Sequence, residues 1–115
     1  MRSIRLFING QWRAGARGRT LEVINPATEQ AVAQLCLADE DDIADAIKAA
    51  AAGFETWRGV SAVDRATILK KIADGLRRDV DAIARVLTEE QGKPLEQSRI
   101  EIATTAAYFE ELRRY

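Results

Sequence analysis

The chain has 115 residues, of which 47% are hydrophobic and 30% are charged, and its 17 basic and 18 acidic side chains give a formal net charge of −1. This composition excludes a collagen-like or disordered chain, and the small net charge favours neither nucleic acid nor an anionic membrane as a partner. The absence of histidine and the single cysteine exclude a Cys/His metal cluster and an internal disulfide.

The length fits one domain or part of one, with enough residues for one core. No apolar run approaches the roughly 20 residues that cross a bilayer, and the start of the chain is too short and too charged for a signal peptide. Cysteine usage is that of a reducing compartment. We therefore expect a cytoplasmic protein without membrane contact.

A β-hairpin is the first predicted element. Ile4 to Ile8 is rich in β-branched and aromatic residues and meets Asn9-Gly10, a pair that favours a tight turn because both positions need positive φ. Arg13 to Arg19 follows as a flexible, solvated basic loop. It contains the G-x-x-G spacing of an RNA-binding KH module, but a KH clamp joins two helices and this loop joins two predicted strands. With no aromatic platform beside it, we expect no nucleic-acid binding.

A second hairpin follows. Thr20 to Asn25 is predicted as one strand and Ala31 to Leu37 as the next, with Pro26 ending the first and opening the turn. Cys36 lies inside the second strand. A catalytic thiolate needs a base or cation to lower its pKa, and the chain has no histidine, so we interpret Cys36 as a structural thiol.

The first predicted helix opens with four acids, Asp39-Glu40-Asp41-Asp42. Carboxylates in one cluster could bind a hard cation. The other interpretation is that Asp39 is the N-cap and the remaining acids complement the helix dipole. One face of this helix is apolar and predicted to be core, up to an end at Gly59; its residues are Ile43, Ile47, Ala50, Phe54 and Trp57.

Ser61 to Leu95 is the longest helical signal, with an apolar stripe that needs cover from other segments. The stripe consists of Leu69, Ile72, Ala73, Leu76, Val80, Ile83, Ala84 and Leu87, and the opposite face of Lys70, Lys71, Asp74, Arg77, Arg78, Asp81 and Arg85. Gly75 weakens the helix and Asp79 can cap a new one, so we predict two helices, residues 62–77 and 80–91.

The ends of these helices also carry signals. Ser61 and Asp64 resemble a capping box at the start, and Gly92 followed by Pro94 predicts a left-handed end. The final helix is predicted over residues 95–115. It has Ile102, Ala106 and Phe109 on one side and Ile100, Ala103 and Ala107 beside them, which implies cover from more than one direction. The fold class is therefore α/β, with β-hairpins in residues 1–38 and about four helices in 39–115.

Five motifs occur in a fixed order: I-N-G-Q-W at Ile8 to Trp12, I-N-P-A-T at Ile24 to Thr28, F-x-x-W at Phe54 to Trp57, D-R-A-T-I-L-x-K-I-A-D at Asp64 to Asp74, and E-Q-G-K-P-L at Glu90 to Leu95. Together they resemble the N-terminal region of the NAD(P)-dependent aldehyde dehydrogenases. E-Q-G-K-P-L and the closing E-E-L-R-R-Y resemble most the succinate-semialdehyde dehydrogenase branch. Glu29 stands where the family often has glycine, which affects the turn type.

The resemblance implies that residues 1–115 are the N-terminal part of a Rossmann-like cofactor domain, outside its main sheet. In the family a cysteine attacks the aldehyde, hydride passes to NAD or NADP, and a glutamate activates water. The contexts of those residues, G-Q-x-C and E-L-G-G-K, do not occur in this sequence. We therefore expect no catalytic and no cofactor-binding residue in this chain, and no cofactor bound by it alone. The implied partner is the remainder of an aldehyde dehydrogenase chain, in a homo-oligomer.

Some family members hold a structural sodium or potassium ion with a main-chain carbonyl beside the N-P pair and an acid after G-K-P. The matching positions are Ile24 and Glu101. Such a site needs several more oxygens, so the alternative is that Glu101 is a solvated helix residue.

The leading function is thus a structural, non-catalytic segment of an aldehyde-oxidising enzyme. Helix faces that would pack on the rest of such an enzyme should then be exposed. The alternative is a free-standing helical module that binds a partner protein through its last helix.

Overall fold

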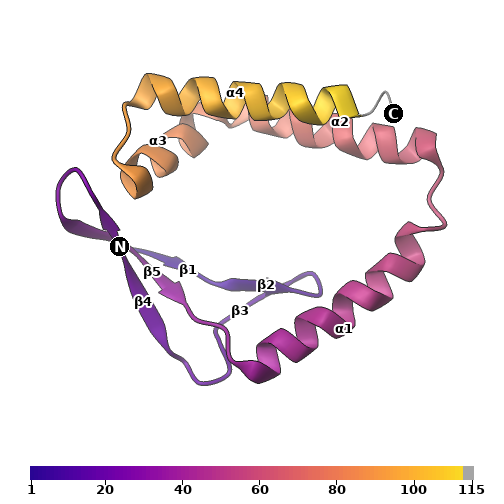
Figure 1. Ribbon diagram of the computed structural model, residues 1–115, viewed down its shortest axis with the longest axis horizontal. Coiled ribbons are helices and arrows are strands. Elements are labelled where there is room, and N and C mark those ends of the chain that lie inside the picture. Colours follow the sequence, from indigo (N-terminus) through magenta and orange to yellow (C-terminus); the bar gives the residue numbers. More distant parts are fainter. Residues whose placement is uncertain (113–115) are drawn as a thin grey trace. The chain divides into compact units, whose positions relative to one another are not determined.

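The computed structural model describes residues 1–112, which form five strands and four helices (Figure 1). They are β1 (Arg2–Ile4), β2 (Leu6–Ile8), β3 (Gln11–Arg13), β4 (Thr20–Asn25), β5 (Gln30–Cys36), α1 (Glu40–Trp57), α2 (Ala62–Arg78), α3 (Val80–Gln91) and α4 (Leu95–Leu112). The predicted α/β class, with strands first and helices after them, is confirmed. The predicted end of the last helix at residue 115 lies outside the described residues.

The chain forms two compact units. Residues 1–25 and 29–59 make the first, and residues 26–28 with those from 60 onward make the second. The first unit therefore holds all five strands and α1, and the second holds α2, α3 and α4. No helix in residues 1–112 combines the length and apolar character needed to cross a bilayer.

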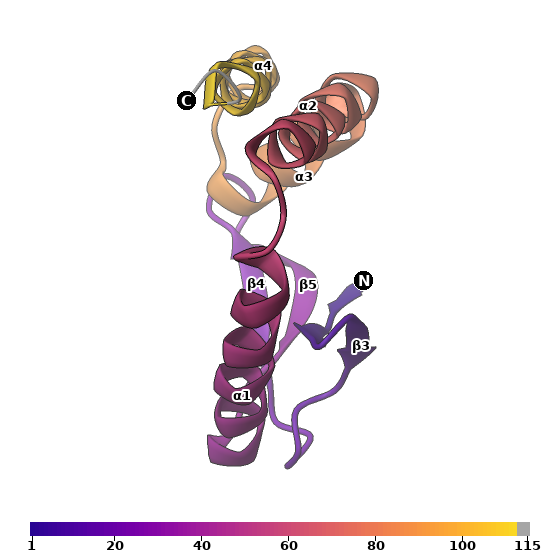
Figure 2. The same cartoon turned by 90° about the vertical axis from the view of Figure 1, so that its right-hand side faces the viewer.

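The strands of the first unit form two sheets. One has the order β1-β5-β4, with β1 parallel and β4 antiparallel to β5, and the other is the hairpin β2-β3. Figure 2 shows β4 and β5 side by side. The hairpin predicted around Asn9-Gly10 is confirmed as β2-β3, but the run from Ile4 to Ile8 divides at Arg5 between the two sheets. The parallel pairing of Ile4 with Leu35 joins segments far apart in sequence, and no local pattern encodes it.

Both predicted hairpin turns are confirmed. Asn9 and Gly10 have φ values of 51° and 77°, the pair of positive angles that a two-residue turn of this type requires. In the longer connection the Glu29 N–H donates to the Asn25 carbonyl at 2.8 Å, and Glu29 has φ of 60°. Glycine adopts this left-handed conformation without steric cost. This is a physical reason why the family that the sequence resembles often has glycine where this chain has Glu29.

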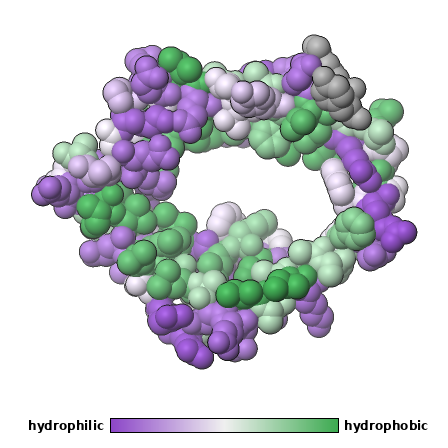
Figure 3. Space-filling model, viewed as in Figure 1, coloured by the Kyte–Doolittle hydropathy of each residue, from purple (hydrophilic) through white to green (hydrophobic). Residues whose placement is uncertain are grey.

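Helix α1 turns its small residues toward the rest of its unit. Asp42 is buried and Ala46 and Ala49 are half-buried. The large apolar residues predicted as core are instead exposed, Ile47 by 66% and Phe54 by 59%. That prediction is wrong for this chain. An apolar stripe shows which face of a helix is favourable to bury, but not whether another segment is present to bury it. Figure 3 shows hydrophobic residues at the surface along α1.

In the second unit α4 packs along α2 and α3 (Figure 1). The buried contacts use small side chains and one isoleucine, namely Ala73, Ala84, Ser98, Ile102 and Ala106. The predicted stripe on residues 61–95 is therefore covered only in part, since Ala73 and Ala84 are buried while Ile72 stays 40% exposed. The second apolar side predicted for α4 is exposed, with Ile100 57% accessible.

The ends of these helices follow the sequence signals closely. The Asp64 N–H donates to Ser61 Oγ at 3.1 Å, and the Ser61 hydroxyl donates to Asp64 Oδ2 at 2.7 Å. The break after Arg78 is confirmed, but the Asp79 side chain makes no capping bond and accepts from Arg78 instead. Gly92 ends α3 with φ of 72° and lies against Pro26 in the same unit.

Candidate functional site

Residues 13–19 of the first unit are bound to the start of α1. The Ala16 N–H donates to Asp42 Oδ2 and the Arg17 N–H donates to Asp39 Oδ2, each at 2.9 Å. Both carboxylates are buried, with Asp39 5% and Asp42 2% exposed. Apart from Gly15 and the half-buried Arg13, the loop is exposed, as predicted for a solvated segment. Two of its backbone amides are nevertheless bound to buried carboxylates instead of to solvent.

Arginine side chains complete this arrangement. Arg13 donates to Asp42 Oδ1 at 2.9 Å and to Asp45 Oδ2 at 3.0 Å, and Arg19 donates to Asp39 Oδ1. The carboxylates thus already have cationic partners. Within residues 1–112 no group of His, Cys, Asp or Glu side chains is arranged to hold a metal ion. The metal-binding interpretation of the acidic cluster is not supported.

The pKa values of these groups follow from the contacts. Backbone hydrogen bonds from Asp39 and Ala16, with the Arg13 charge, hold the pKa of Asp42 below its usual value despite burial. Burial acts to raise the pKa of Asp39, but hydrogen bonds from Arg19 and Arg17 outweigh it and the pKa is lowered. The hydrogen bond to Asp45 raises the pKa of Arg13. All three groups are therefore charged at neutral pH.

Asp39 and Asp42 also belong to the start of α1. The Asp39 N–H donates to Asp42 Oδ2 at 2.9 Å, and the Ile43 N–H donates to the Asp39 carbonyl at 3.0 Å. The predicted N-cap position of Asp39 is confirmed. Sequence reasoning missed the second role of these two acids, which is to accept hydrogen bonds from the backbone of the loop. The available signal was charge complementarity between the basic loop and the acidic turn.

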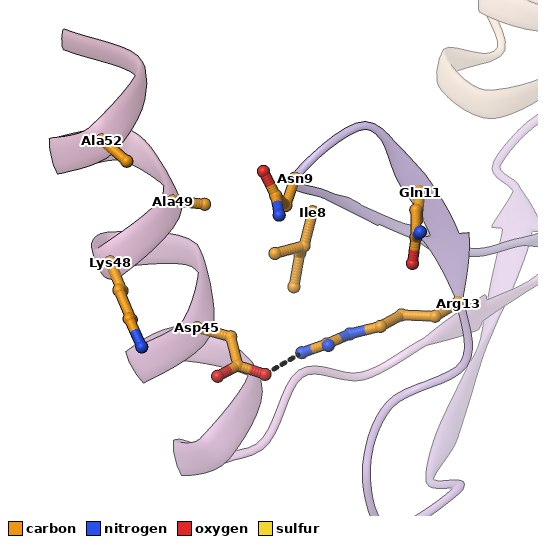
Figure 4. A pocket seen from close by; sticks show the side chains of 8 residues that line it. All are labelled: Ile8, Asn9, Gln11, Arg13, Asp45, Lys48, Ala49 and Ala52. Carbon is orange, nitrogen blue, oxygen red and sulfur yellow. Dashed lines mark hydrogen bonds and ion pairs between the residues drawn. The ribbon is translucent and has the colours of Figure 1, made fainter. Parts of the chain in front are cut away.

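A cavity of about 330 Å³ lies between the β2-β3 hairpin and α1 (Figure 4). Figure 4 shows the Arg13 guanidinium reaching across it to Asp45. Its lining residues are Ile8, Asn9, Gln11, Arg13, Asp45, Lys48, Ala49 and Ala52. The lining offers amide and charged groups but neither thiol nor hydroxyl, so it does not supply the nucleophile of an acyl-transfer site.

The remaining residues singled out from sequence lie elsewhere. Cys36 is a free, buried thiol at the end of β5, as expected for a structural cysteine. Ile24 lies in β4 of the first unit and Glu101 in α4 of the second, where it accepts from Lys93. Glu101 is thus an ion-paired helix residue, and the monovalent cation site stays a prediction.

The comparisons with known proteins agree on one family. The pattern of the aldehyde dehydrogenase family matches residues 12–115. A 4-(hydroxymethyl)benzenesulfonate dehydrogenase of Comamonas testosteroni is 41% identical in an alignment 113 positions long that covers 95% of this chain and 24% of that protein. An aldehyde dehydrogenase of Emericella nidulans is 35% identical over 101 residues, 87% of this chain and 20% of that protein.

Solved structures give the same result. A 3,6-anhydro-L-galactose dehydrogenase in complex with NAP matches with a TM-score of 0.93 and 26% identity, over 98% of this chain and 24% of that one. A betaine aldehyde dehydrogenase of Staphylococcus aureus in complex with NAD+ matches with a TM-score of 0.92 and 29% identity, over 98% and 23%. The chain therefore spans about a quarter or less of the length of these proteins.

Proposed function

This chain belongs to the aldehyde dehydrogenase family, and from that premise we propose that it is a structural, non-catalytic segment of an enzyme that oxidises an aldehyde to a carboxylic acid with NAD+ or NADP+. The observation that carries the proposal is the match of nearly the whole chain, in sequence and in fold, to the N-terminal part of such enzymes. The comparisons give no support to the alternative of a free-standing interaction module.

The described residues do not fit the cofactor themselves. A dinucleotide is held by a glycine-rich turn that leads from a strand to a helix N-terminus. Here the connection from β5 to α1, residues 37–39, has no glycine, and α1 opens with acids that would repel a pyrophosphate. We therefore propose that cofactor binding and the oxidation step belong to residues outside this chain.

The exposed faces of the helices support a scaffolding role. Ile43, Ile47 and Phe54 recur at helical spacing on α1 and are each more than half exposed. A surface of this kind favours contact with further protein over contact with water. We propose that the remainder of the enzyme chain covers it.

A pair of substitutions in the longest natural protein that carries this segment tests the role. Ile47→Asp places a charge within the apolar stripe, while Ala44→Asp adds the same charge on an exposed residue of the same helix outside it. Burying an unpaired charge is strongly destabilising, so we expect Ile47→Asp to abolish folded, active enzyme and Ala44→Asp to retain it. Equal activity of the two variants would show that the α1 face stays in water and would overturn the proposal.

We propose the succinate-semialdehyde dehydrogenase branch as the subtype. E-Q-G-K-P-L at Glu90 to Leu95 and the closing E-E-L-R-R-Y support it. Measurement of kcat/KM for succinate semialdehyde, betaine aldehyde and an aromatic aldehyde would test it. A clear preference for either of the other two aldehydes would refute the assignment.

We also propose the cell compartment and the oligomeric state of the enzyme. A cytoplasmic homo-oligomer is proposed from the resemblance and from cysteine usage. Light scattering of the purified enzyme tests its assembly, and a strictly monomeric species would refute the oligomer. Fractionation of the source cells tests the compartment.

A further inference from the structure

We propose that Asn9 is a site of spontaneous deamidation and isoaspartate formation, and so a substrate for isoaspartate-methylating repair enzymes. The proposal rests on the turn that joins β2 to β3 and does not depend on the enzyme's activity. Asn9 and Gly10 are both exposed. Glycine has no side chain to hinder an approach to its backbone nitrogen, and nothing lies within 4 Å of the position a Cβ would occupy at Gly10.

The reaction needs only water. The Gly10 amide nitrogen loses its proton to solvent base and attacks Cγ of Asn9, forming an N–Cγ bond. The Cγ–Nδ2 bond then breaks, and ammonia leaves with the proton it gains. Water adds to one of the two carbonyls of the resulting succinimide. Opening at the backbone carbonyl gives isoaspartate, and opening at Cγ gives aspartate, so the balance is one water consumed and one ammonia released.

The nucleophile is accessible in this fold. Within residues 1–112 the Gly10 N–H makes no hydrogen bond, since the turn is closed by the pairing of Ile8 with Gln11. The Asn9 side chain likewise makes none within the described residues and lines the 330 Å³ cavity (Figure 4). That cavity gives the side chain room to rotate toward its own backbone. Neither reacting group must first break a bond of its own.

The hairpin can also open. Its strands have three residues each and it is not paired to the larger sheet. Two-stranded hairpins are marginally stable, and such elements open locally at low free energy. Attack requires the Asn9 backbone to leave the left-handed conformation seen at φ of 51°, and a short opening of the turn permits this.

The product would change its surroundings. Isoaspartate adds a methylene to the backbone of a two-residue turn, so the register that pairs Leu6 with Arg13 cannot be kept. Arg13 carries the contacts to Asp42 and Asp45, and these would weaken with it. Aspartate keeps the backbone length and tolerates the turn, so this product leaves the hairpin intact.

The chain supplies its own control. Its only other asparagine is Asn25, which precedes Pro26, and proline has no N–H to lose. The protein in its longest natural form would be incubated at mildly alkaline pH and mapped by peptide mass spectrometry, with methyltransferase labelling of isoaspartate. A free peptide of residues 7–12 provides the unstructured reference rate. An Asn9→Asp variant fixes the elution position of the aspartate product.

We expect the Asn9 peptide to gain the mass of an NH2-to-OH exchange and to be labelled, while the Asn25 peptide is unchanged. The rate should lie within about tenfold of the free peptide, which corresponds to about 1.4 kcal/mol of opening free energy. An unchanged residue 9 after the free peptide has converted would show that the fold locks the turn, and would overturn the proposal. Equal mass gain at Asn25 would overturn the mechanism.

Discussion

Replacement of Gly15 by alanine is the sharpest test of how the loop of residues 13–19 is packed. A Cβ at this position would lie 1.9 Å from the carbonyl oxygen of Leu37, and real Cβ contacts essentially never fall below 3.0 Å. The obstacle is backbone, so it cannot be relieved by a side-chain rotation. The loop and the connection before α1 must separate by roughly 1 Å.

The expected loss of stability follows from the packing and the hydrogen bonds that this movement disturbs. Overpacking of this kind costs about 1–3 kcal/mol. The displaced segments share the hydrogen bonds from Gly18 N–H to the Gly15 carbonyl and from Leu37 N–H to the Arg19 carbonyl, both 2.9 Å. Each contributes about 1 kcal/mol. We therefore expect Gly15→Ala to lower the free energy of unfolding by about 2–5 kcal/mol, a large part of the stability of a typical domain.

Urea unfolding followed by circular dichroism measures the change. Gly53→Ala is the matched control, because Gly53 lies inside α1 with nothing within 4 Å of the added carbon. It should stabilise the protein by about 0.5–1 kcal/mol through helix propensity. A loss below about 0.5 kcal/mol for Gly15→Ala would mean that the loop moves aside freely, and the packing described for it would be wrong.

Three further predictions use other sites. Glu29→Gly should raise the free energy of unfolding by about 0.5–1 kcal/mol, because it relieves a left-handed φ of 60°; a lower urea midpoint would contradict this. Ser61→Ala should lower it by about 1 kcal/mol, since the N-cap of α2 is lost; an unchanged midpoint would show that the cap contributes nothing. Asp39 and Asp42 have folded pKa values below 3.8, so their stabilising contribution is present above that pH and is lost as pH falls through the folded values. Amide chemical shifts of the loop should move in that acidic window, and shifts that move only well above 3.8 would contradict the assignment.

Local signals account for what could be predicted from the sequence. Asn9-Gly10, Ser61 and Gly92 act on their immediate neighbours, and each stands in the structure where its chemistry requires. The helix break was predicted for the same reason, since Gly75 and Asp79 act within one or two turns. At Asp79 the predicted N-cap position is confirmed, but its carboxylate accepts from Arg78 and makes no capping bond.

The features that could not be predicted depend on distant partners. The pairing of β1 with β5 joins Ile4 to Leu35, and the loop contacts join Ala16 to Asp42. Neither contact produces a periodic pattern in the sequence, since periodicity indicates only which face of an element is apolar. The same limit explains the candidate site. Acids at a helix start suggest a cap from sequence, and only the fold shows that Asp42 also holds a loop.

On the proposed function, helix α1 contributes to the enzyme through packing. Its small residues pack within the first unit, while Ile43, Ile47 and Phe54 stay more than half exposed. Full burial of such a side chain is worth about 1.5–3 kcal/mol, so roughly half of that, about 1 kcal/mol or more per residue, is still to be gained when the face is covered. Three residues then contribute about 3 kcal/mol, more than half of the roughly 5 kcal/mol at the low end of domain stability. The segment and whatever covers it should therefore stabilise each other, and on the proposed function Ile47→Asp should damage the whole enzyme through lost packing.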